Sequence, residues 1–296
     1  MMRRRFDMSG ARDTNGKTRT GPELPEPIPR FENFGHVTLR GARNTRDLGA
    51  LSTADGRTIA AGRLIRSGDL HKCTDEDIEL LRDGHGLIRV VDFRTAKERG
   101  GAPDPQSRMQ GIDFAELPVF SEAAVGITHE GGIAGDIAAL KRFSGNAHET
   151  IRGLYVTCLL GEDGKRAYRE FFETLLAAED GATLWHCTEG KDRAGLASVL
   201  VEYALGVPMP HIRADYLATN LFVRDAAEEI LDALAGHGLL EHVDLDVDSI
   251  FYADMDYLDA ALEAVEQECG GMDAYLAAVL GVGELERERL RELYLQ

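Results

Sequence analysis

The sequence predicts an α/β fold in which a central, mostly parallel sheet is wrapped by helices, and three observations support this prediction. Apolar runs typical of strands alternate with segments of helical periodicity, an order that favours a sheet covered by helices. Residues 87–93 form a continuous apolar run, which is typical of a strand buried inside a sheet. Residues 182–203 contain an apolar run, a glycine-containing loop and a helical pattern in succession, as a strand–loop–helix unit would.

The N-terminal part divides into an arm and the start of a domain. Residues 1–29 are polar and rich in Gly, Thr, Arg and Pro, so we expect a disordered arm. The folded domain is expected to span residues 30–296. Its first elements are predicted strands at 33–40 and 58–65. A helix should follow from Thr74, where Asp77 completes an approximate capping pattern.

The C-terminal part is predicted to be mainly helical around the buried strands. Gly206 and Pro208 end the helix of the strand–loop–helix unit. The other elements expected here are a strand at 114–119 and helices around 137–143 and at 155–160, 167–178, 212–218, 226–234, 257–265 and 284–293.

Composition limits the classes of protein to which the chain can belong. The 296 residues are 44% apolar and 28% charged, which suits one large globular domain. The formal net charge of −18 argues against a nucleic-acid partner, because basic surface binds a phosphate backbone. An acidic body also repels phosphorylated ligands, so a site for one needs local positive potential. The candidate residues for that potential are Lys191, Arg193, Arg94, Arg46 and Arg66.

Cysteine usage and hydropathy bear on cofactors and location. The four cysteines form no CxxC pair and no cluster with zinc spacing, so we expect neither a disulfide framework nor a metal or other cofactor. No apolar run approaches 18 residues, so no membrane span is predicted. The basic start of the chain lacks an apolar segment behind it and makes a poor signal peptide. We therefore expect a cytoplasmic protein, with export by an unrecognised route left open.

One ten-residue stretch carries the strongest functional signal. Residues 186–195 read His-Cys-Thr-Glu-Gly-Lys-Asp-Arg-Ala-Gly, so Cys187 lies six positions before Arg193 in a loop that opens a predicted helix. Backbone N–H groups at a helix start bind anions and lower the pKa of a thiol. An arginine can hold two phosphate oxygens at once. We interpret the loop as a phosphate site with a nucleophilic thiol, Cys187, at its base.

The other loop residues fit this interpretation. The residues expected to bind the phosphate group are Thr188, Glu189, Gly190, Lys191 and Arg193. Gly190 lets the backbone curl closely around an anion because it has no Cβ. Attack of the Cys187 thiolate on phosphorus would give a cysteinyl-phosphate, which water then hydrolyses. We expect His186 to orient the loop through hydrogen bonds rather than to act as a base.

The stretch resembles the Cys-x5-Arg signature of protein tyrosine phosphatases, and its longer form is similar to the HCxxGKDR loop of a bacterial tyrosine and dual-specificity phosphatase group. Residues 43–49 resemble that group's N-x-R-D-L-G motif. Residues 62–70 and 90–99 resemble its RSG-x-L and V-x-D-L-R-x-x-x-E blocks, and residues 270–276 also fit. Four ordered blocks are far more specific than one short motif. The resemblance implies a tyrosine-phosphatase-like fold and metal-independent phosphatase activity.

The general acid that protonates the leaving group is less well defined by the sequence. The single tryptophan, Trp185, is not followed by Pro-Asp, so a mobile loop with that motif is absent. The resemblance implies instead that Asp192 is the acid, with a salt bridge or helix cap as its alternative role. Asp92 is the second candidate, although a strand-end hydrogen bond to Arg94 or Arg46 is favoured for it.

Two further features follow from the resemblance. The position after the loop arginine commonly carries Ser or Thr but is Ala194 here, so we expect slower breakdown of the cysteinyl-phosphate. A helical segment within residues 222–256 would form either a lid over the site or a simple cover of the sheet.

Three functions compete for the same loop. Hydrolysis of phosphate monoesters, with protein phosphotyrosine favoured, is the leading hypothesis. A phosphoinositide or dual-specificity phosphatase and a non-catalytic phosphate-binding module are the alternatives, so the expected partner is a phosphorylated protein or a phosphoinositide. A nucleotide-binding loop is excluded because Asp192 stands where that motif needs Ser or Thr. The sequence does not predict the oligomeric state.

Overall fold

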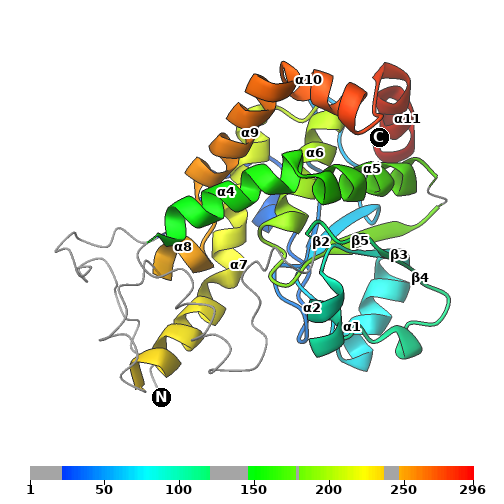
Figure 1. The fold of residues 1–296 in the computed structure, drawn as a ribbon. Coiled ribbons are helices and arrows are strands. Elements are labelled where there is room, and N and C mark those ends of the chain that lie inside the picture. The colour runs from blue at the N-terminus through cyan, green and yellow to red at the C-terminus, as the bar shows by residue number, and fades with distance from the viewer. Residues whose placement is uncertain (1–21, 121–145, 178–179, 237–246) are drawn as a thin grey trace.

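The computed structural model describes residues 22–120, 146–177, 180–236 and 247–296. Within these residues the fold centres on a five-stranded sheet with the order β1-β2-β5-β3-β4 (Figure 1). Its strands are β1 (Arg46–Asp47), β2 (Leu64–Ser67), β3 (Leu87–Asp92), β4 (Asp113–Glu116) and β5 (Ala182–His186). Strands β2, β5, β3 and β4 run parallel, and β1 is antiparallel to β2. The predicted mostly parallel sheet is confirmed.

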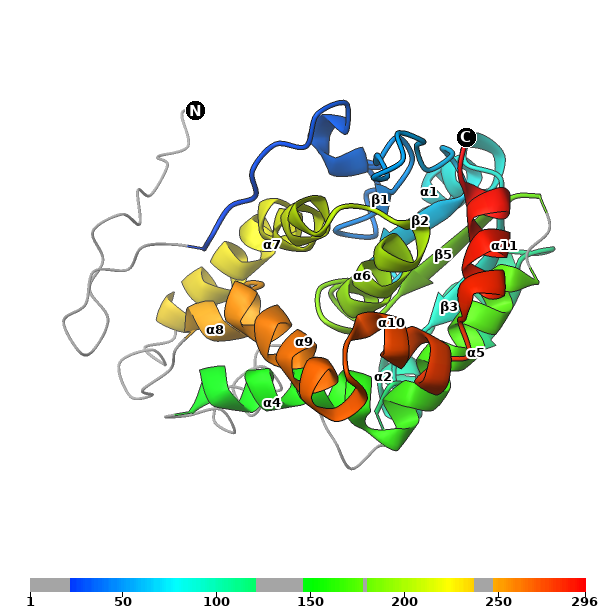
Figure 2. The same cartoon turned by 90° about the horizontal axis from the view of Figure 1, so that it is seen from above.

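Helices cover both faces of this sheet. In Figure 1, α1 and α2 lie below the sheet and α5 and α6 lie above it, while Figure 2 shows α6 surrounded by α7, α9, α10 and α11. The helical elements in the described residues are η1 (Glu32–Gly35), α1 (Asp75–Glu79), η2 (Leu80–Gly84), α2 (Ala96–Gly101), η3 (Gln106–Arg108), α4 (Ala147–Leu160), α5 (Glu162–Leu176), α6 (Arg193–Leu205), α7 (Met209–Gly236), α8 (Val247–Phe251), α9 (Met255–Cys269), α10 (Met272–Ala274), η5 (Tyr275–Val279) and α11 (Glu284–Tyr294).

The two central strands separate two hydrophobic cores. Val90 on β3 and Leu184 on β5 belong to the smaller cluster, whereas their neighbours Val91 and Trp185 belong to the larger one. Side chains alternate across a strand, so a run that is apolar throughout supplies both faces. This double burial fixes the register of β3 and β5, and therefore the place where β5 ends and the loop begins.

Helix boundaries follow the predicted capping signals. Thr74 caps α1 in a capping box with Asp77, as expected. A second box joins Thr95 and Glu98 at the start of α2, where the sequence analysis predicted no helix. At the end of α6, Gly206 adopts φ +90°, which allows the left-handed cap that the sequence suggested.

Of the two strands predicted near the N-terminus, the first is wrong and the second begins later than expected. Within residues 33–40 the chain forms the end of η1, which stops at Gly35, and His36 alone makes an isolated bridge to Arg46. Positive φ angles at Asn33 and Phe34 end any extended run there. Over residues 58–65 the strand begins only at Leu64, because Gly62 turns the chain with φ +68°.

Several expected segments are longer than predicted or lie outside the described residues. Helix α7 joins the two helices expected at 212–218 and 226–234. The helix expected around 137–143 lies outside the described residues, as do residues 237–246 of the segment considered as a lid. Residues 1–21 of the expected arm are also outside them, whereas Ile28 is buried and Glu23 accepts a hydrogen bond from Asn220. Among the described helices, none is both long and apolar enough to cross a membrane.

Candidate active site

The loop at residues 187–192 joins the end of β5 to the start of α6, as the strand–loop–helix prediction requires. Gly190 has φ +67°, and a Cβ there would lie 2.6 Å from the Ser67 carbonyl group, so the close approach of β2 requires glycine. On the same side, the Asp69 N–H donates to the Thr188 carbonyl over 3.0 Å. The end of β2 therefore supports the outside of the loop.

Cys187 lies at the base of this loop and is 2% exposed. The backbone N–H of Ala194, in the first turn of α6, donates to its sulfur. Burial raises the pKa of the Cys187 thiol, and the nearby Arg193 and the Ala194 N–H offset only part of this effect. The expected lowering of the thiol pKa is therefore contradicted in this arrangement. The physical reason is desolvation, which penalises the charged thiolate.

Arg193 is held by a carboxylate that the sequence analysis did not assign to the site. Its Nη1 and Nη2 donate to Glu98 over 2.8 and 2.7 Å, in the parallel two-bond geometry that arginine favours. The Thr188 hydroxyl donates to the same carboxylate over 2.8 Å. Burial would raise the pKa of Glu98, but Arg193 and these hydrogen bonds lower it to about 2. Glu98 thus fixes the plane of the guanidinium.

Asp192 stands at the N-cap position of α6 but makes no capping hydrogen bond. Its Oδ1 accepts from the Tyr155 hydroxyl over 2.7 Å and lies 3.0 Å from the Lys191 ammonium. The salt bridge proposed as its alternative role is therefore present, and the helix cap is not. Its side chain remains about 29% exposed, so it keeps access to solvent. A structural contact and a role as acid are compatible at this position.

The Lys191 ammonium, expected to bind the phosphate group, contacts Asp192 and two carbonyls outside the loop. Its ammonium donates to the carbonyls of Ile250, at 3.1 Å, and Tyr252, at 3.4 Å, and the residue is buried. These carbonyls lie at the end of α8 and just after it. Lys191 of the loop therefore bonds to residues 250–252, which lie in the described end of the segment considered as a lid.

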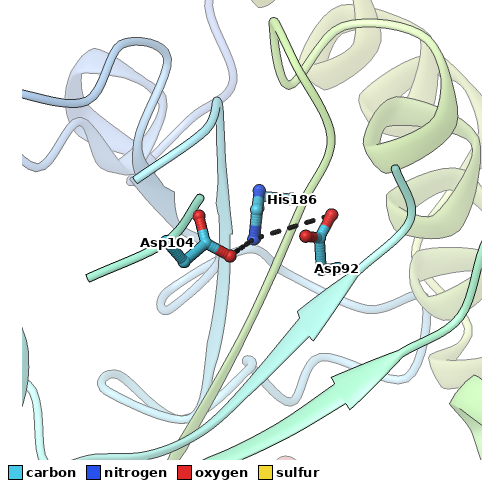
Figure 3. A group of neighbouring side chains, drawn as sticks. All are labelled: Asp92, Asp104 and His186. Atoms are coloured by element: carbon cyan, nitrogen blue, oxygen red, sulfur yellow. Dashed lines mark hydrogen bonds and ion pairs between the residues drawn. The ribbon is translucent and has the colours of Figure 1, made fainter. Parts of the chain in front are cut away.

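His186 and Asp92 belong to an ion network on the α2 side of the loop. Figure 3 shows His186 between Asp104 and Asp92; its Nε2 lies 3.1 Å from Asp104 and 3.9 Å from Asp92. Its Nδ1 lies 3.2 Å from the carbonyl of Cys187. A carbonyl and a carboxylate are both acceptors, so both ring nitrogens must donate. Burial lowers the pKa of His186, but the two aspartates raise it above its usual value.

Arg94 also belongs to this network, and its guanidinium bonds to the Asp92 carboxylate. Its Nε and Nη2 donate to the Asp92 carboxylate over 2.8–3.1 Å, and its Nη2 lies 2.9 Å from Asp104. The favoured structural role of Asp92 is thus supported by a strand-end bond to Arg94. Arg46, the other partner considered for Asp92, bonds to Asp215 instead.

Three residues of this network, Asp92, Asp104 and His186, are spaced closely enough to be considered as metal ligands. Ligand atoms of Asp92, Asp104 and His186 lie within 4.8 Å of one another. Arg94 already contacts both carboxylates, and a guanidinium stays charged at any physiological pH. A divalent cation would have to displace it. We therefore assign the group to the orientation of His186.

Several residues at the site were not found by sequence reasoning. Glu98 and Asn44 lie inside the blocks that carried the family resemblance, which was the one signal available for them. Arg66 was expected only as a source of positive potential, and its bond to the loop was not foreseen. Tyr155 contacts the loop residue Asp192, whereas Asp104 and Asp215 bond to side chains beside the loop. All three come from distant positions and leave no local pattern in the sequence.

Comparisons with known proteins agree with this geometry. The sequence model of the tyrosine phosphatase family matches residues 37–296. A Cupriavidus necator protein provisionally named as a tyrosine-protein phosphatase is 33% identical over 254 residues, covering 85% of each chain. A tyrosine-protein phosphatase of Nostoc commune is 27% identical, covering 79% of this chain and 74% of its own. The triple specificity protein phosphatase PtpB of Mycobacterium tuberculosis is 28% identical, covering 87% of this chain and 98% of its own. The chain belongs to the tyrosine phosphatase family.

Proposed function

We propose that this phosphatase hydrolyses phosphate monoesters, protein phosphotyrosine above all, through a cysteinyl-phosphate on Cys187. The observation that carries the proposal is the position of Cys187 at the base of a loop that leads directly into α6, with Arg193 as the first residue of that helix. A helix start concentrates partial positive charge where an anion and a thiolate would both lie. Non-catalytic binding would need neither the thiol nor its N–H donor.

The chemistry proceeds in two displacements. Cys187 loses its proton to solvent, and the thiolate sulfur bonds to phosphorus while the bond from phosphorus to the leaving oxygen breaks. That oxygen takes the proton of Asp192. Water then attacks phosphorus and gives a proton back to Asp192, and the sulfur–phosphorus bond breaks to release phosphate. The thiolate is the nucleophile of the first displacement and water is that of the second, with Asp192 moving the proton in both, so the proposed cycle uses no metal ion.

Arg193 binds the phosphoryl oxygens in this scheme. Each terminal nitrogen of a guanidinium carries two hydrogens, and Glu98 takes one from each. The second hydrogens make only long contacts, 3.4 Å to the Phe93 carbonyl and 3.3 Å to the Thr188 hydroxyl. A phosphate dianion can replace these contacts while the bond pair to Glu98 persists.

The primary test compares variants on p-nitrophenyl phosphate, phosphopeptides and phosphoinositides with EDTA present. Cys187→Ser should lower kcat at least about 1,000-fold on every substrate, because a hydroxyl is a far weaker nucleophile than a thiolate. Cys269→Ser, at a half-buried cysteine on α9, is the matched control and should retain activity. Retained turnover in Cys187→Ser would end the covalent mechanism.

The general acid is tested by a second pair of variants. Asp192→Asn should lower kcat on a phosphotyrosine peptide by about 100-fold or more, since an acid contributes roughly 10²–10⁴. The loss should be smaller with p-nitrophenyl phosphate, whose leaving group needs less protonation. Asp92→Asn is the comparison. A loss confined to Asp92→Asn would transfer the role of acid to Asp92.

Two further measurements address the substrate class and the hydrolysis of the cysteinyl-phosphate. The name of the mycobacterial relative indicates three specificities for that protein, which supports including phosphoserine, phosphothreonine and phosphoinositide substrates in the panel. Because Ala194 supplies no hydroxyl to the departing sulfur, we expect a pre-steady-state burst with an aryl phosphate. Absence of a burst, with the first step limiting, would contradict slow breakdown.

A further inference from the structure

A buried polar cluster lies behind the phosphate loop, on the side opposite to Glu98 and His186. Its members are at most 2% exposed and come from the segment before β1, from β1 and β2, and from α6 and α7. They are Asn44, Arg46, Arg66, Glu202, Asp215 and Thr219. The mechanism above uses none of them.

Two members of this cluster hold one carbonyl of the loop. Arg66 donates from Nη2 to the Gly190 carbonyl over 2.8 Å, and Asn44 donates from Nδ2 to the same oxygen over 3.1 Å. A trans peptide is planar, and its C=O and N–H point in opposite directions. A Gly190 carbonyl turned toward the cluster therefore turns the N–H of Lys191 away from it. That N–H is one of the loop donors that an anion can use.

Asp215 on α7 fixes the two arginines of the cluster. Arg66 donates from Nη1 to its Oδ2 over 2.8 Å, and Arg46 donates to its Oδ1 and, over 3.1 Å, to its backbone carbonyl. Arg46 also donates to Asn44 Oδ1 over 3.2 Å, which orients the amide toward Gly190. The Gly190 carbonyl is thus braced through a chain of buried contacts that begins at Asp215.

The two arginines of the cluster bond to a single carboxylate. Both guanidinium groups contact Asp215, and no hydrogen-bond donor within the described part of the chain reaches either oxygen of Glu202. Burial and the nearby Asp215 carboxylate raise the pKa of Glu202 well above its usual value. Burial lowers the pKa of Arg46 to about 10. Two guanidinium groups therefore lie next to the loop on one carboxylate.

We propose that Asn44, Arg66 and Asp215 are positioning residues of the phosphate loop, holding the Gly190 carbonyl and placing the buried Arg66 guanidinium behind it. The inference rests on the proposed function for the identity of the ligand, a phosphoryl oxyanion. It explains how a chain with a net charge of −18 attracts such a ligand although Glu98 matches Arg193 and Asp192 matches Lys191.

A purely structural role makes a different prediction. Burying charged groups costs desolvation energy, and apolar residues often join elements equally well. If the cluster only joined β1, β2 and α7, its variants would lower Tm and leave oxyanion binding unchanged. A positioning role changes the affinity for an oxyanion in variants that still fold.

The test measures tungstate binding by calorimetry, and kcat and KM for p-nitrophenyl phosphate, on the full chain. Asn44→Ser removes one neutral donor to Gly190 and should weaken tungstate binding about 10-fold. Arg66→Met removes a donor and a charge, and about 100-fold is expected. Arg66→Lys should restore part of the affinity. KM should rise more than kcat falls, because the loop binds substrate before chemistry begins.

A matched control comes from the same helix as Asp215. Arg213 on α7 pairs with Asp259 on α9 at a partly exposed position, and Arg213→Ala should leave tungstate affinity and KM unchanged. Native affinity in folded Asn44→Ser and Arg66→Met would overturn the proposal. If Arg66→Met does not fold, the tungstate affinity of Asn44→Ser, which removes no charge, decides between the positioning role and a purely structural one. Tungstate binding is read without turnover, so failure of the proposed function appears separately, as native protein without Cys187-dependent hydrolysis.

Discussion

The two flanks of the phosphate loop both bury arginines, but they balance charge differently. On the α2 flank, Arg193 meets Glu98, and Arg94 with His186 meets Asp92 and Asp104. Every cation there has a carboxylate of its own. On the α7 flank, two arginines share one ionised carboxylate, as described above. The first flank is neutral as a whole, whereas on the second two arginines bond to the one carboxylate of Asp215.

This difference separates two tasks of an anion-binding loop. A matched pair holds a side chain in one geometry at little electrostatic cost, which suits the arginine that grips the substrate. An unmatched buried charge gives weaker geometric control but a stronger field, because low dielectric surroundings screen it poorly. The field at the loop therefore depends on the charges buried beside it as well as on the net charge of the whole chain.

The largest expected effect is on the neutral flank. Glu98→Gln leaves Arg193 buried without its counter-charge, and breaking a buried pair costs about 3–5 kcal/mol. Glutamine still accepts the Thr95 N–H, so the start of α2 should survive. A misplaced Arg193 should lower kcat/KM about 100-fold. Urea unfolding and steady-state kinetics measure the two effects.

The pH dependence and a control sharpen this first prediction. The pKa of Glu98 is lowered to about 2, so its stabilisation is present above its usual value of 4.5 and is lost as pH falls through about 2. Glu116→Gln, which breaks the exposed pair with Arg99, should cost less than about 1 kcal/mol. Unchanged or higher activity in Glu98→Gln would show that Glu98 competes with substrate instead of orienting Arg193.

A smaller, pH-dependent effect should follow from Asp104→Asn on the same flank. Burial lowers the pKa of His186, but Asp92 and Asp104 raise it overall, so the pair stabilises the fold below pH 6.5 and loses that contribution as pH rises through the raised value. The variant should therefore lose about 3 kcal/mol at pH 5.5 and less at pH 9. Unfolding at both pH values measures this.

The matched control for Asp104 is a second His–Asp pair near the loop. Asp69 contacts His71, and both side chains are partly exposed. Asp69→Asn should cost less than about 1 kcal/mol at either pH. An equal loss in Asp104→Asn at pH 5.5 and pH 9 would show that His186 is not charged, and the neutral balance of this flank would fail.

The features that could be predicted from the sequence are those whose interacting residues lie close together along the chain. Residues 186–195 are contiguous, so the loop, the Cys187–Arg193 spacing and the strand before it could all be inferred. The strand predicted at 58–65 starts too early because Gly62 turns the chain before β2 begins at Leu64. The direction of the Cys187 pKa shift failed because burial, a tertiary property, outweighs the adjacent charges. Asp215 and Asp104 come from distant positions and bond to side chains beside the loop, and short-range patterns do not report such contacts.

The smallest expected effect tests the charge balance of the α7 flank. Burial and Asp215 raise the pKa of Glu202 in the native state. Below the usual pKa of 4.5 this carboxyl group is protonated in both the native and the unfolded state and does not lower the stability. As pH rises from 4.5 toward the raised pKa, the native state loses stability. Glutamine mimics the protonated carboxyl at every pH. Glu202→Gln should therefore match the native Tm at pH 4 and exceed it at pH 8, by roughly 2–4 °C for each kcal/mol gained. Scanning calorimetry at both pH values measures the difference. A lower Tm for the variant at pH 8 would mean that Glu202 is ionised against Arg46 and Arg66, and the two flanks would then balance charge in the same way.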